Sequence, residues 1–289
     1  MGSQPVSLAQ LRQLTLSKLS PQYGQEEAEA LFRRLLMHFL PEWQLLWLQS
    51  RGEALCPPDL LSKWEGALHR LSHYEPIAYI IGKTHFVDIE LLILPGVFIP
   101  RPETESWAYA LYAQLAVSPR TILDIGTGSG ALAIFFAQRF PHAQVYAVDK
   151  NPLAILLAER NAVRNGVSIH TAILTFGQEP LPEYFPRKWD LIVSNPPYVP
   201  WEAYSETGEN VRLFEPPEAI FCTGFELYER IAIYAYESLS TGGRIAVEVF
   251  PPHAESIAAL WKDYGLAPTL HKDERGLWRW IVAVREGEE

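Results

Sequence analysis

Apolar side chains in the first 84 residues recur with the spacing of an α-helix. One stripe follows the i, i+3, i+4, i+7 rule and ends before Pro41; it consists of Ala28, Leu31, Phe32, Leu35, Leu36 and Phe39. Further amphipathic stretches cover Leu8–Leu19, Trp43–Leu48 and Leu60–Leu71, and the residues that punctuate them are Pro21, Gly52, Pro57 and Pro58. The pattern predicts a small helical bundle.

The pattern changes between Phe86 and Ile99. Phe86, Val87, Ile89 and the run Leu91–Ile93 favour extended structure, and Pro95-Gly96 then favours a turn. We interpret this segment as a β-hairpin linker.

Beyond Trp107, short runs rich in Val, Ile and Leu alternate with helical periods. The predicted strands are Thr121–Ile125, Gln144–Val148, Ser168–Ile173, Asp190–Ser194, Arg244–Val249 and Leu277–Val284, and the clearest helices are Ala131–Arg139 and Pro152–Asn165. Such runs are typical of buried parallel strands joined by right-handed crossovers. The sequence therefore predicts an α/β fold with a doubly wound, Rossmann-like sheet. The expected organisation is a helical domain over 1–84, a hairpin linker over 85–103 and an α/β domain over 104–289.

Composition is that of a globular enzyme, because 48% of the 289 residues are apolar and 12% are aromatic. No run approaches the eighteen or so apolar residues of a membrane span, and the first residues lack the pattern of a secretory leader. We expect a cytoplasmic protein that does not enter a membrane. The two cysteines, Cys56 and Cys222, form no CxxC pair, so neither a disulfide framework nor a metal site is predicted.

The net charge of −10 is concentrated in the C-terminal part of the chain. Residues 1–84 carry eight basic and eight acidic side chains, which leaves 16 of the 24 basic and 26 of the 34 acidic groups for the remainder. Tight binding to a phosphate backbone depends on many Lys and Arg contacts. We therefore expect no direct binding of nucleic acid, although a local basic patch stays possible.

A glycine-rich loop follows the first predicted strand of the α/β domain. It reads Gly126-Thr127-Gly128-Ser129-Gly130 and leads directly into a helix, whose free N–H groups suit a nucleotide-like ligand. Asp149 ends the second strand, 23 residues after Gly126, where an acidic side chain can accept hydrogen bonds from both ribose hydroxyls. A nicotinamide dehydrogenase is the competing hypothesis, but the third glycine of its fingerprint could be replaced only by Ala133.

Asp124, just before the glycine loop, suits S-adenosylmethionine as the cofactor. Its carboxylate could orient the loop or meet the ammonium group of that cofactor, and a purely structural role at the end of the strand is an equal alternative.

The fourth predicted strand of the α/β domain ends in Asn195-Pro196-Pro197-Tyr198, at the edge of the sheet where ligands of such folds bind. Consecutive prolines fix φ and remove two N–H donors, so carbonyl oxygens are left to accept. The Asn195 side-chain oxygen and the Pro196 carbonyl can each accept one N–H of a planar NH2 group, while Tyr198 packs on its flat face. We predict Asn195, Pro196 and Tyr198 as catalytic residues of nitrogen methylation without a catalytic base.

These motifs resemble those of the bacterial-type peptide chain release factor glutamine N5-methyltransferases. The tetrapeptide alone also occurs in enzymes that methylate amino groups of nucleic-acid bases. Two further segments narrow the resemblance, the stretch Glu75–Lys83 and the stretch Phe98–Glu105. An N-terminal helical bundle is also typical of the family and serves there in substrate recognition.

The resemblance implies a class I methyltransferase sheet and a protein substrate, the glutamine of the Gly-Gly-Gln motif in class I release factors. It implies that Gly126–Gly130 and Asp149 contact S-adenosylmethionine, and that Asn195 lies between cofactor and substrate. Asn195–Tyr198 would hold the side-chain amide. Phe98 and Arg101 would line the entrance for the substrate, with hairpin core and surface salt bridge as their alternative roles.

The chain departs from the family pattern near Thr175-Phe176-Gly177, where an acidic residue usually precedes a bulky one beside the adenine. We expect Phe176 to take the stacking role. Phe221–Gly224 is less glycine-rich than usual, and Glu248-Val249 lacks the usual glycine after Glu. Two other functions stay open at this point: an amino-methyltransferase acting on rRNA or DNA, and a scaffold that binds the cofactor without catalysis.

Overall fold

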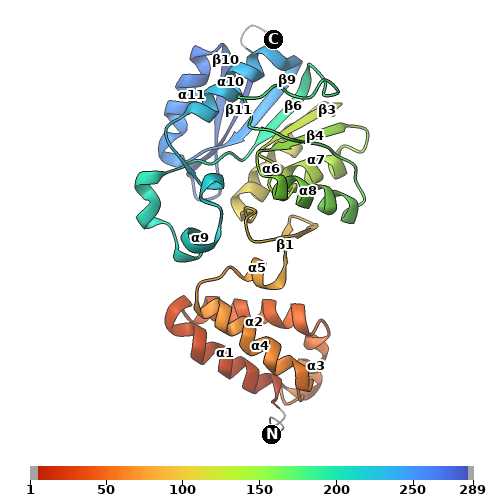
Figure 1. The fold of residues 1–289 in the computed structure, drawn as a ribbon, viewed down its shortest axis with the longest axis vertical. Helices are drawn as coiled ribbons and strands as arrows, with labels where there is room; N and C mark the ends of the chain where they lie inside the picture. Colours follow the sequence, from red (N-terminus) through yellow and green to blue (C-terminus); the bar gives the residue numbers. More distant parts are fainter. Residues whose placement is uncertain (1–5, 286–289) are drawn as a thin grey trace. The chain divides into compact units, whose positions relative to one another are not determined.

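The computed structural model describes residues 6–285 (Figure 1). Their contacts form two units. The first unit contains residues up to Gly82 together with Glu209–Phe214, and the second contains Lys83–Gly208 and the residues from Glu215 onward. The domain limits predicted at residues 84 and 103 stay predictions, because this grouping by contacts divides the chain after Gly82 and adds a distant segment to the helical unit.

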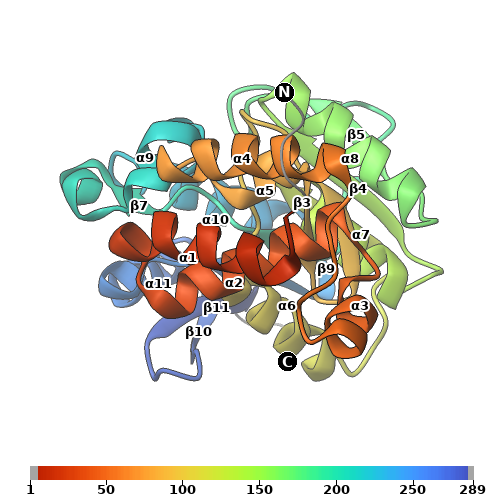
Figure 2. The ribbon, with the colours of Figure 1, turned by 90° about the horizontal axis from the view of Figure 1, so that it is seen from below.

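The first unit is mainly helical in its described part, and Figure 2 shows α1, α2 and α4 running side by side. Its helices are α1 (Leu8–Tyr23), α2 (Gln25–Phe39), α3 (Trp43–Ser50), α4 (Pro58–Ser72), α5 (Ile77–Ile81) and α9 (Glu209–Phe214). Trp64 is fully buried between Phe32 and Thr15, and its indole N–H donates to the Thr15 hydroxyl at 2.9 Å. The predicted bundle is therefore present.

The sequence pattern suggested that Pro21 ends α1, but it does not. The proline lies inside the helix, which continues to Tyr23 and ends where the N–H of Gly24 donates to the carbonyl of Ser20. A proline in the last turn removes only one backbone hydrogen bond, and Gly24 has the positive φ of +79° that changes the chain direction.

The second unit begins with a hairpin of β1 (Lys83–Phe86) and β2 (Ile89–Leu92). Its turn lies at Val87-Asp88, and Val87 has a φ of +55°. Pro95-Gly96 forms a later turn, closed by the N–H of Val97 and the carbonyl of Leu94. The hairpin and the turn at Pro95-Gly96 were both predicted. Val87 was expected to be extended and instead lies in the hairpin turn, which the sequence did not indicate because a β-branched residue rarely adopts positive φ.

The sheet of the second unit has seven strands in the order β10-β11-β9-β6-β3-β4-β5. Their bounds are β3 (Thr121–Ile125), β4 (Gln144–Asp149), β5 (His170–Ile173), β6 (Trp189–Ser194), β9 (Leu239–Glu248), β10 (Leu266–Lys272) and β11 (Trp278–Arg285). β9, β6, β3, β4 and β5 are parallel, whereas β11 is antiparallel to both of its neighbours. The predicted α/β fold is confirmed, and its sheet contains both parallel and antiparallel strands.

Two features of this sheet were not predicted. β11 was expected to be parallel, and β10 was not expected at all. β10 lies at an edge, and Pro268, Thr269, His271 and Lys272 interrupt its apolar residues, so it lacks the apolar run by which a buried strand is recognised.

Helices cover both faces of the sheet (Figure 1). The helices of this unit are α6 (Pro102–Gln114), α7 (Ala131–Arg139), α8 (Pro152–Arg164), α10 (Glu226–Ser238) and α11 (Ala254–Asp263). One apolar core joins α6 and α7 to alternate strand residues such as Ile122 and Val193, and the other joins α10 and α11 to the residues between them, such as Leu123 and Ile192. Short segments of the loops between β6 and α10 form β7 (Val199–Pro200), β8 (Phe221–Cys222) and the 3-10 helices Trp201–Glu206 and Pro217–Ala219, and a further 3-10 helix covers Pro251–His253.

Candidate active site

The glycine loop joins the carboxyl end of β3 to the first turn of α7. The N–H groups of Gly126 and Thr127 donate to the carbonyl of Val148 on β4, at 2.8 and 3.0 Å, and this ties the loop to the edge of the sheet. Gly130 has a φ of +87°, and a Cβ there would lie 3.1 Å from the backbone of Ala158 on α8. Glycine at this position therefore lets α7 start close to α8.

Asp149 at the end of β4 holds the same loop. Its Oδ2 accepts the N–H of Gly128 at 2.9 Å, and its Oδ1 accepts the N–H of Asn151 at 2.9 Å. Burial raises the pKa of Asp149, and these backbone donors oppose that rise. Each carboxylate oxygen accepts more than one hydrogen bond, so the contacts are compatible with the predicted binding of ribose hydroxyls.

Asp124 holds the glycine loop, and its contact with an ammonium group stays a prediction. Its Oδ2 accepts the hydroxyl of Thr127 at 2.7 Å and the N–H of Ala133 at 3.1 Å, so it orients the glycine loop. Its Oδ1 is buried and has no hydrogen-bond partner among residues 6–285. A buried acceptor without a partner beside a cavity fits a ligand that brings a donor, such as the ammonium group of S-adenosylmethionine.

Burial of the carboxyl group raises the pKa of Asp124 to about 7, against a usual value of about 3.9. Between about pH 4 and pH 7, this carboxyl group is therefore protonated in the folded protein but ionised in the unfolded chain. The free energy of unfolding of the cofactor-free protein should fall as the pH rises from about 4 to 7, by at most about 1.4 kcal/mol per pH unit from this group.

Asp124→Asn should remove that contribution. Urea unfolding of both proteins at several pH values between 4 and 8 measures it, and the difference between the two curves isolates this carboxyl group. Curves with equal slopes across this range would contradict the raised pKa.

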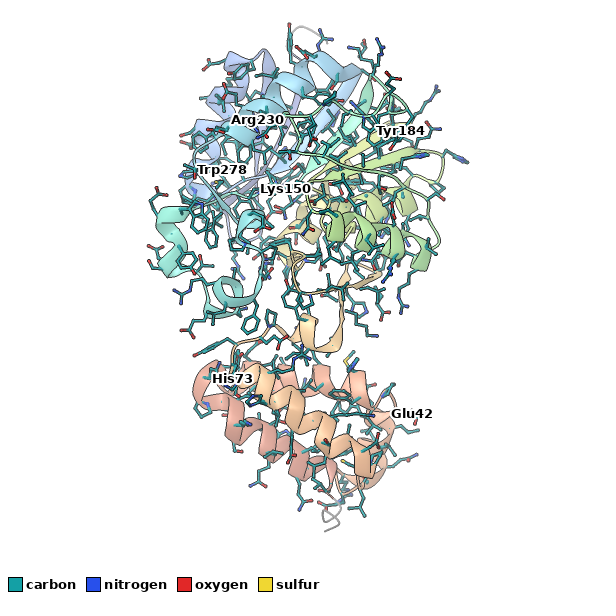
Figure 3. The ribbon with its side chains drawn as sticks, in the orientation of Figure 1. Glu42, His73, Lys150, Tyr184, Arg230 and Trp278 are labelled. Carbon is teal, nitrogen blue, oxygen red and sulfur yellow. The ribbon has the colours of Figure 1, made fainter. Side chains whose placement is uncertain are left out.

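One cavity of about 680 Å³ collects most of the predicted residues. Gly126–Ser129 of the glycine loop, Asp124 and Asp149 line it, as do Asn195, Pro196 and Pro197 at the end of β6, whereas Gly130 is not among the lining residues. Lys150 and Arg230, both labelled in Figure 3, also line it, the second from α10. The cavity therefore places the predicted cofactor loop and the segment Asn195–Tyr198, called the diproline segment below, in one site, as expected for ligands at the carboxyl ends of parallel strands.

Phe176 lines the cavity too and is 9% exposed. Its ring packs edge-on against Tyr234, with centroids 5.2 Å apart, and the adjacent Gly177 lies so close to Arg230 that a Cβ would come within 2.7 Å of that side chain. An apolar ring held in this way is compatible with the predicted stacking against adenine, and that role stays a prediction.

Asn195 is fixed by a hydrogen bond from its Nδ2 to the Thr104 hydroxyl oxygen, at 3.0 Å. The preceding residue, Ser194, donates its hydroxyl to the carbonyl of Ile125 at 2.7 Å, which ties the end of β6 to β3. Pro196 is buried and Pro197 is partly exposed. The segment thus leaves the sheet in a defined direction along the cavity wall.

Tyr198 anchors the segment through Glu248 and Phe250. Its hydroxyl donates to Oε1 of Glu248 at 3.1 Å, its ring stacks on Phe250, and it is absent from the residues that line the cavity. Burial raises the pKa of this hydroxyl well above its ordinary value. These contacts anchor the segment, and a contact of the Tyr198 ring with substrate stays a prediction.

Phe98 lines the cavity, whereas Arg101 does not. The Arg101 guanidinium lies over the Phe98 ring, 4.8 Å from its centroid, and forms an ion pair with Glu215. Oε2 of Glu215 also accepts the N–H of Ile99 at 3.1 Å, and this carboxylate is fully buried. Arg101 therefore packs on Phe98, and the salt bridge considered as its alternative role joins this partly exposed guanidinium to a buried carboxylate.

Sequence reasoning gave no role to Thr104, Glu248 or Glu215. Glu248 carried a usable signal, because it is a charged residue that directly follows the apolar run Ile245–Val247 at the carboxyl end of a predicted strand. Thr104 and Glu215 lie in helix and loop positions whose partners are more than 90 residues away, so no local pattern marks them.

Two other properties concern the described residues as a whole. Among residues 6–285, no group of three or more His, Cys, Asp or Glu side chains is arranged to hold a metal ion. Within the same range, the helices lack the length and apolar character needed to cross a bilayer.

Comparison with known proteins gives the class first. Residues 88–211 match the family model for the methyltransferase small domain. The crystal structure of a methyltransferase from Pyrococcus furiosus has the same fold, with a TM-score of 0.52, 19% identity, and coverage of 77% of this chain and 99% of the other. Together with the mixed sheet and the glycine loop, the family match defines an S-adenosylmethionine-dependent methyltransferase.

The particular family follows from the whole chain. Residues 10–82 match the model for the PrmC N-terminal domain. The release factor glutamine methyltransferase of Geobacter sulfurreducens is 36% identical over 233 residues, which cover 80% of each chain. The enzyme of the same name from Koribacter versatilis is 33% identical over 259 residues, 86% of this chain and 88% of the other. The chain belongs to the release factor glutamine methyltransferase family.

Proposed function

We propose that this protein transfers a methyl group from S-adenosylmethionine to the side-chain amide nitrogen of glutamine in the Gly-Gly-Gln motif of class I peptide chain release factors. The names of its relatives support the substrate. One observation within the chain carries the proposal: the diproline segment lines the same cavity as the cofactor loop. This segment contains Asn195, whose side-chain oxygen can accept a hydrogen bond from a substrate NH2 group. We assign the protein to the cytoplasm, where that substrate works.

The residues of the cavity divide the work between binding and orientation. S-adenosylmethionine supplies an electrophilic methyl group on a sulfonium sulfur. Asp149 accepts the ribose hydroxyls, the Oδ1 of Asp124 accepts from the ammonium group, and Phe176 packs on the adenine. Asn195 Oδ1 and the Pro196 carbonyl each accept one N–H of the glutamine side chain, which aims the nitrogen lone pair along the line of attack.

Methyl transfer then needs no strong base. The nitrogen forms a bond to the methyl carbon as the bond from carbon to sulfur breaks, and the nitrogen gains positive charge. The two carbonyl oxygens stabilise that charge through the N–H groups they accept, and one proton leaves to water afterwards. Orientation of this kind can contribute about 7 to 11 kcal/mol, against about 1 to 3 kcal/mol for one hydrogen bond, so positioning is the main contribution of the site.

Mass spectrometry tests the proposed function directly. The purified protein, S-adenosylmethionine and a class I release factor should give a mass increase of one methyl group on the glutamine of the Gly-Gly-Gln peptide. Parallel reactions with ribosomal RNA and with DNA test the alternative substrate class. Methylation of nucleic acid together with an unmodified release factor would overturn the proposal.

Asp149→Ala should weaken the binding of S-adenosylmethionine about 10- to 100-fold, because hydrogen bonds from ribose to a charged acceptor are lost and the N–H of Gly128 loses its partner. Isothermal titration measures the dissociation constant. Asp190→Ala is a matched control, since Asp190 accepts the N–H groups of Arg120 and Thr121 at the opposite end of the sheet. Equal effects of the two substitutions on affinity would assign Asp149 a structural role only.

A further inference from the structure

A cluster of buried polar side chains lies behind the diproline segment. Its centre is Glu248, the last residue of β9, which is completely buried. Oε2 of Glu248 accepts the Thr104 hydroxyl at 2.6 Å and the Trp107 indole N–H at 2.8 Å, and Oε1 accepts the Tyr198 hydroxyl at 3.1 Å. Thr104 and Trp107 lie one turn apart on α6, and Thr104 also lines the cavity.

The hydrogen bonds of this cluster leave one arrangement for the Asn195 side chain. Oε2 of Glu248 receives two donors, so it carries no proton in either charge state of the carboxyl group. The single proton of the Thr104 hydroxyl is therefore committed to Glu248. The Thr104 oxygen can then only accept, and the group that it accepts from is the NH2 of Asn195, at 3.0 Å.

This order of donors determines which end of the Asn195 amide faces the substrate. With the NH2 group held by Thr104, the carbonyl Oδ1 is the branch left for a ligand in the cavity. A reversed amide would set two hydrogen-bond donors against the donors of a substrate NH2 group. It would also leave the Thr104 oxygen facing a second acceptor, so both ends of the reversed side chain would be unfavourable.

We propose that Thr104, held by Glu248, is a positioning residue that keeps the Asn195 carbonyl oxygen directed at the substrate NH2 group. The inference rests on the proposed function for the identity of that group. The same carboxylate holds Tyr198, so the diproline segment is fixed at both ends by one buried side chain. Glu248 and Thr104 act through Asn195 and touch no reacting atom.

A double-substitution cycle tests this role. Thr104→Val keeps the shape of the buried side chain but removes the hydroxyl, whereas Thr104→Ser keeps the hydroxyl. We expect Thr104→Val to lower kcat about 10-fold, with the KM for release factor and the dissociation constant of S-adenosylmethionine changed less than twofold. Thr104→Ser should retain at least half of the wild-type kcat.

The cycle is completed in a protein that already carries Asn195→Ala. If Thr104 acts only through Asn195, adding Thr104→Val there should change kcat less than twofold. A role in packing alone predicts instead that the two substitutions multiply. Multiplying effects, or a Thr104→Ser protein as slow as Thr104→Val, would overturn the inference.

A measurement without substrate separates this inference from the proposed function. The side-chain NH2 resonances of Asn195 can be identified in an NMR spectrum by their absence in Asn195→Ala. They should move in Thr104→Val and stay near their wild-type positions in Thr104→Ser. Unchanged resonances in Thr104→Val would refute the positioning role, whereas a wild-type protein that leaves release factor unmethylated would refute the function alone.

Discussion

Asn195→Ala should lower turnover about 100-fold or more while the affinity for S-adenosylmethionine stays nearly unchanged. The substitution removes the acceptor that orients the substrate NH2 group and stabilises its developing charge, and such interactions are strongest in the transition state. Mass spectrometry of methylated release factor gives kcat, and isothermal titration gives the dissociation constant of the cofactor.

The contrast between these two measurements is the test of the role of Asn195. Asn195 lines the cavity at the end of β6, whereas the loop Gly126–Gly130 follows β3. The effect of Asn195→Ala on turnover can therefore be separated from its effect on cofactor affinity. A loss of cofactor affinity as large as the loss of turnover would show that Asn195 supports the whole pocket rather than the reacting nitrogen.

Gly130→Ala should lower the free energy of unfolding by about 2 to 4 kcal/mol. The backbone there has a φ of +87°, which costs a residue with a Cβ about 1 kcal/mol or more, and the new Cβ would press on the backbone of Ala158 at 3.1 Å. Urea unfolding of the cofactor-free protein measures the change.

Gly166→Ala is the matched control for this substitution. Its φ is +71°, close to that of Gly130, but a Cβ there would meet no atom within 4 Å. It should therefore lose only the conformational part, about 1 kcal/mol. Equal losses at the two positions would mean that the close approach of α7 and α8 at Gly130 contributes nothing.

Local patterns were sufficient to predict most of the elements. Thr121–Ile125 and Ala131–Arg139 have the predicted bounds, because a short apolar run and a helical period are properties of neighbouring residues. The direction of β11 depends on which strands it lies between, and β10 is an edge strand without a continuous apolar run. Neither property is written in a local pattern, which is why both were missed.

The same distinction applies to the site. The glycine loop and the diproline segment are contiguous motifs, and both were predicted to bind ligands at the carboxyl edge of the sheet, where one cavity contains them. Thr104 and Glu248 are joined to each other across 144 residues of sequence. Only the fold brings such partners together, so the residues that hold Asn195 could not be predicted as its neighbours.

The helical unit is built from two separate lengths of chain, since Glu209–Phe214 groups with the residues before Lys83. The polypeptide therefore passes between the units three times, after Gly82, after Gly208 and after Phe214. A protease that cuts only near Gly82 would leave the helical fragment without its α9 segment, and the excised part would not be a complete copy of the unit. A fragment that is meant to represent the helical unit should therefore be designed with Glu209–Phe214 supplied.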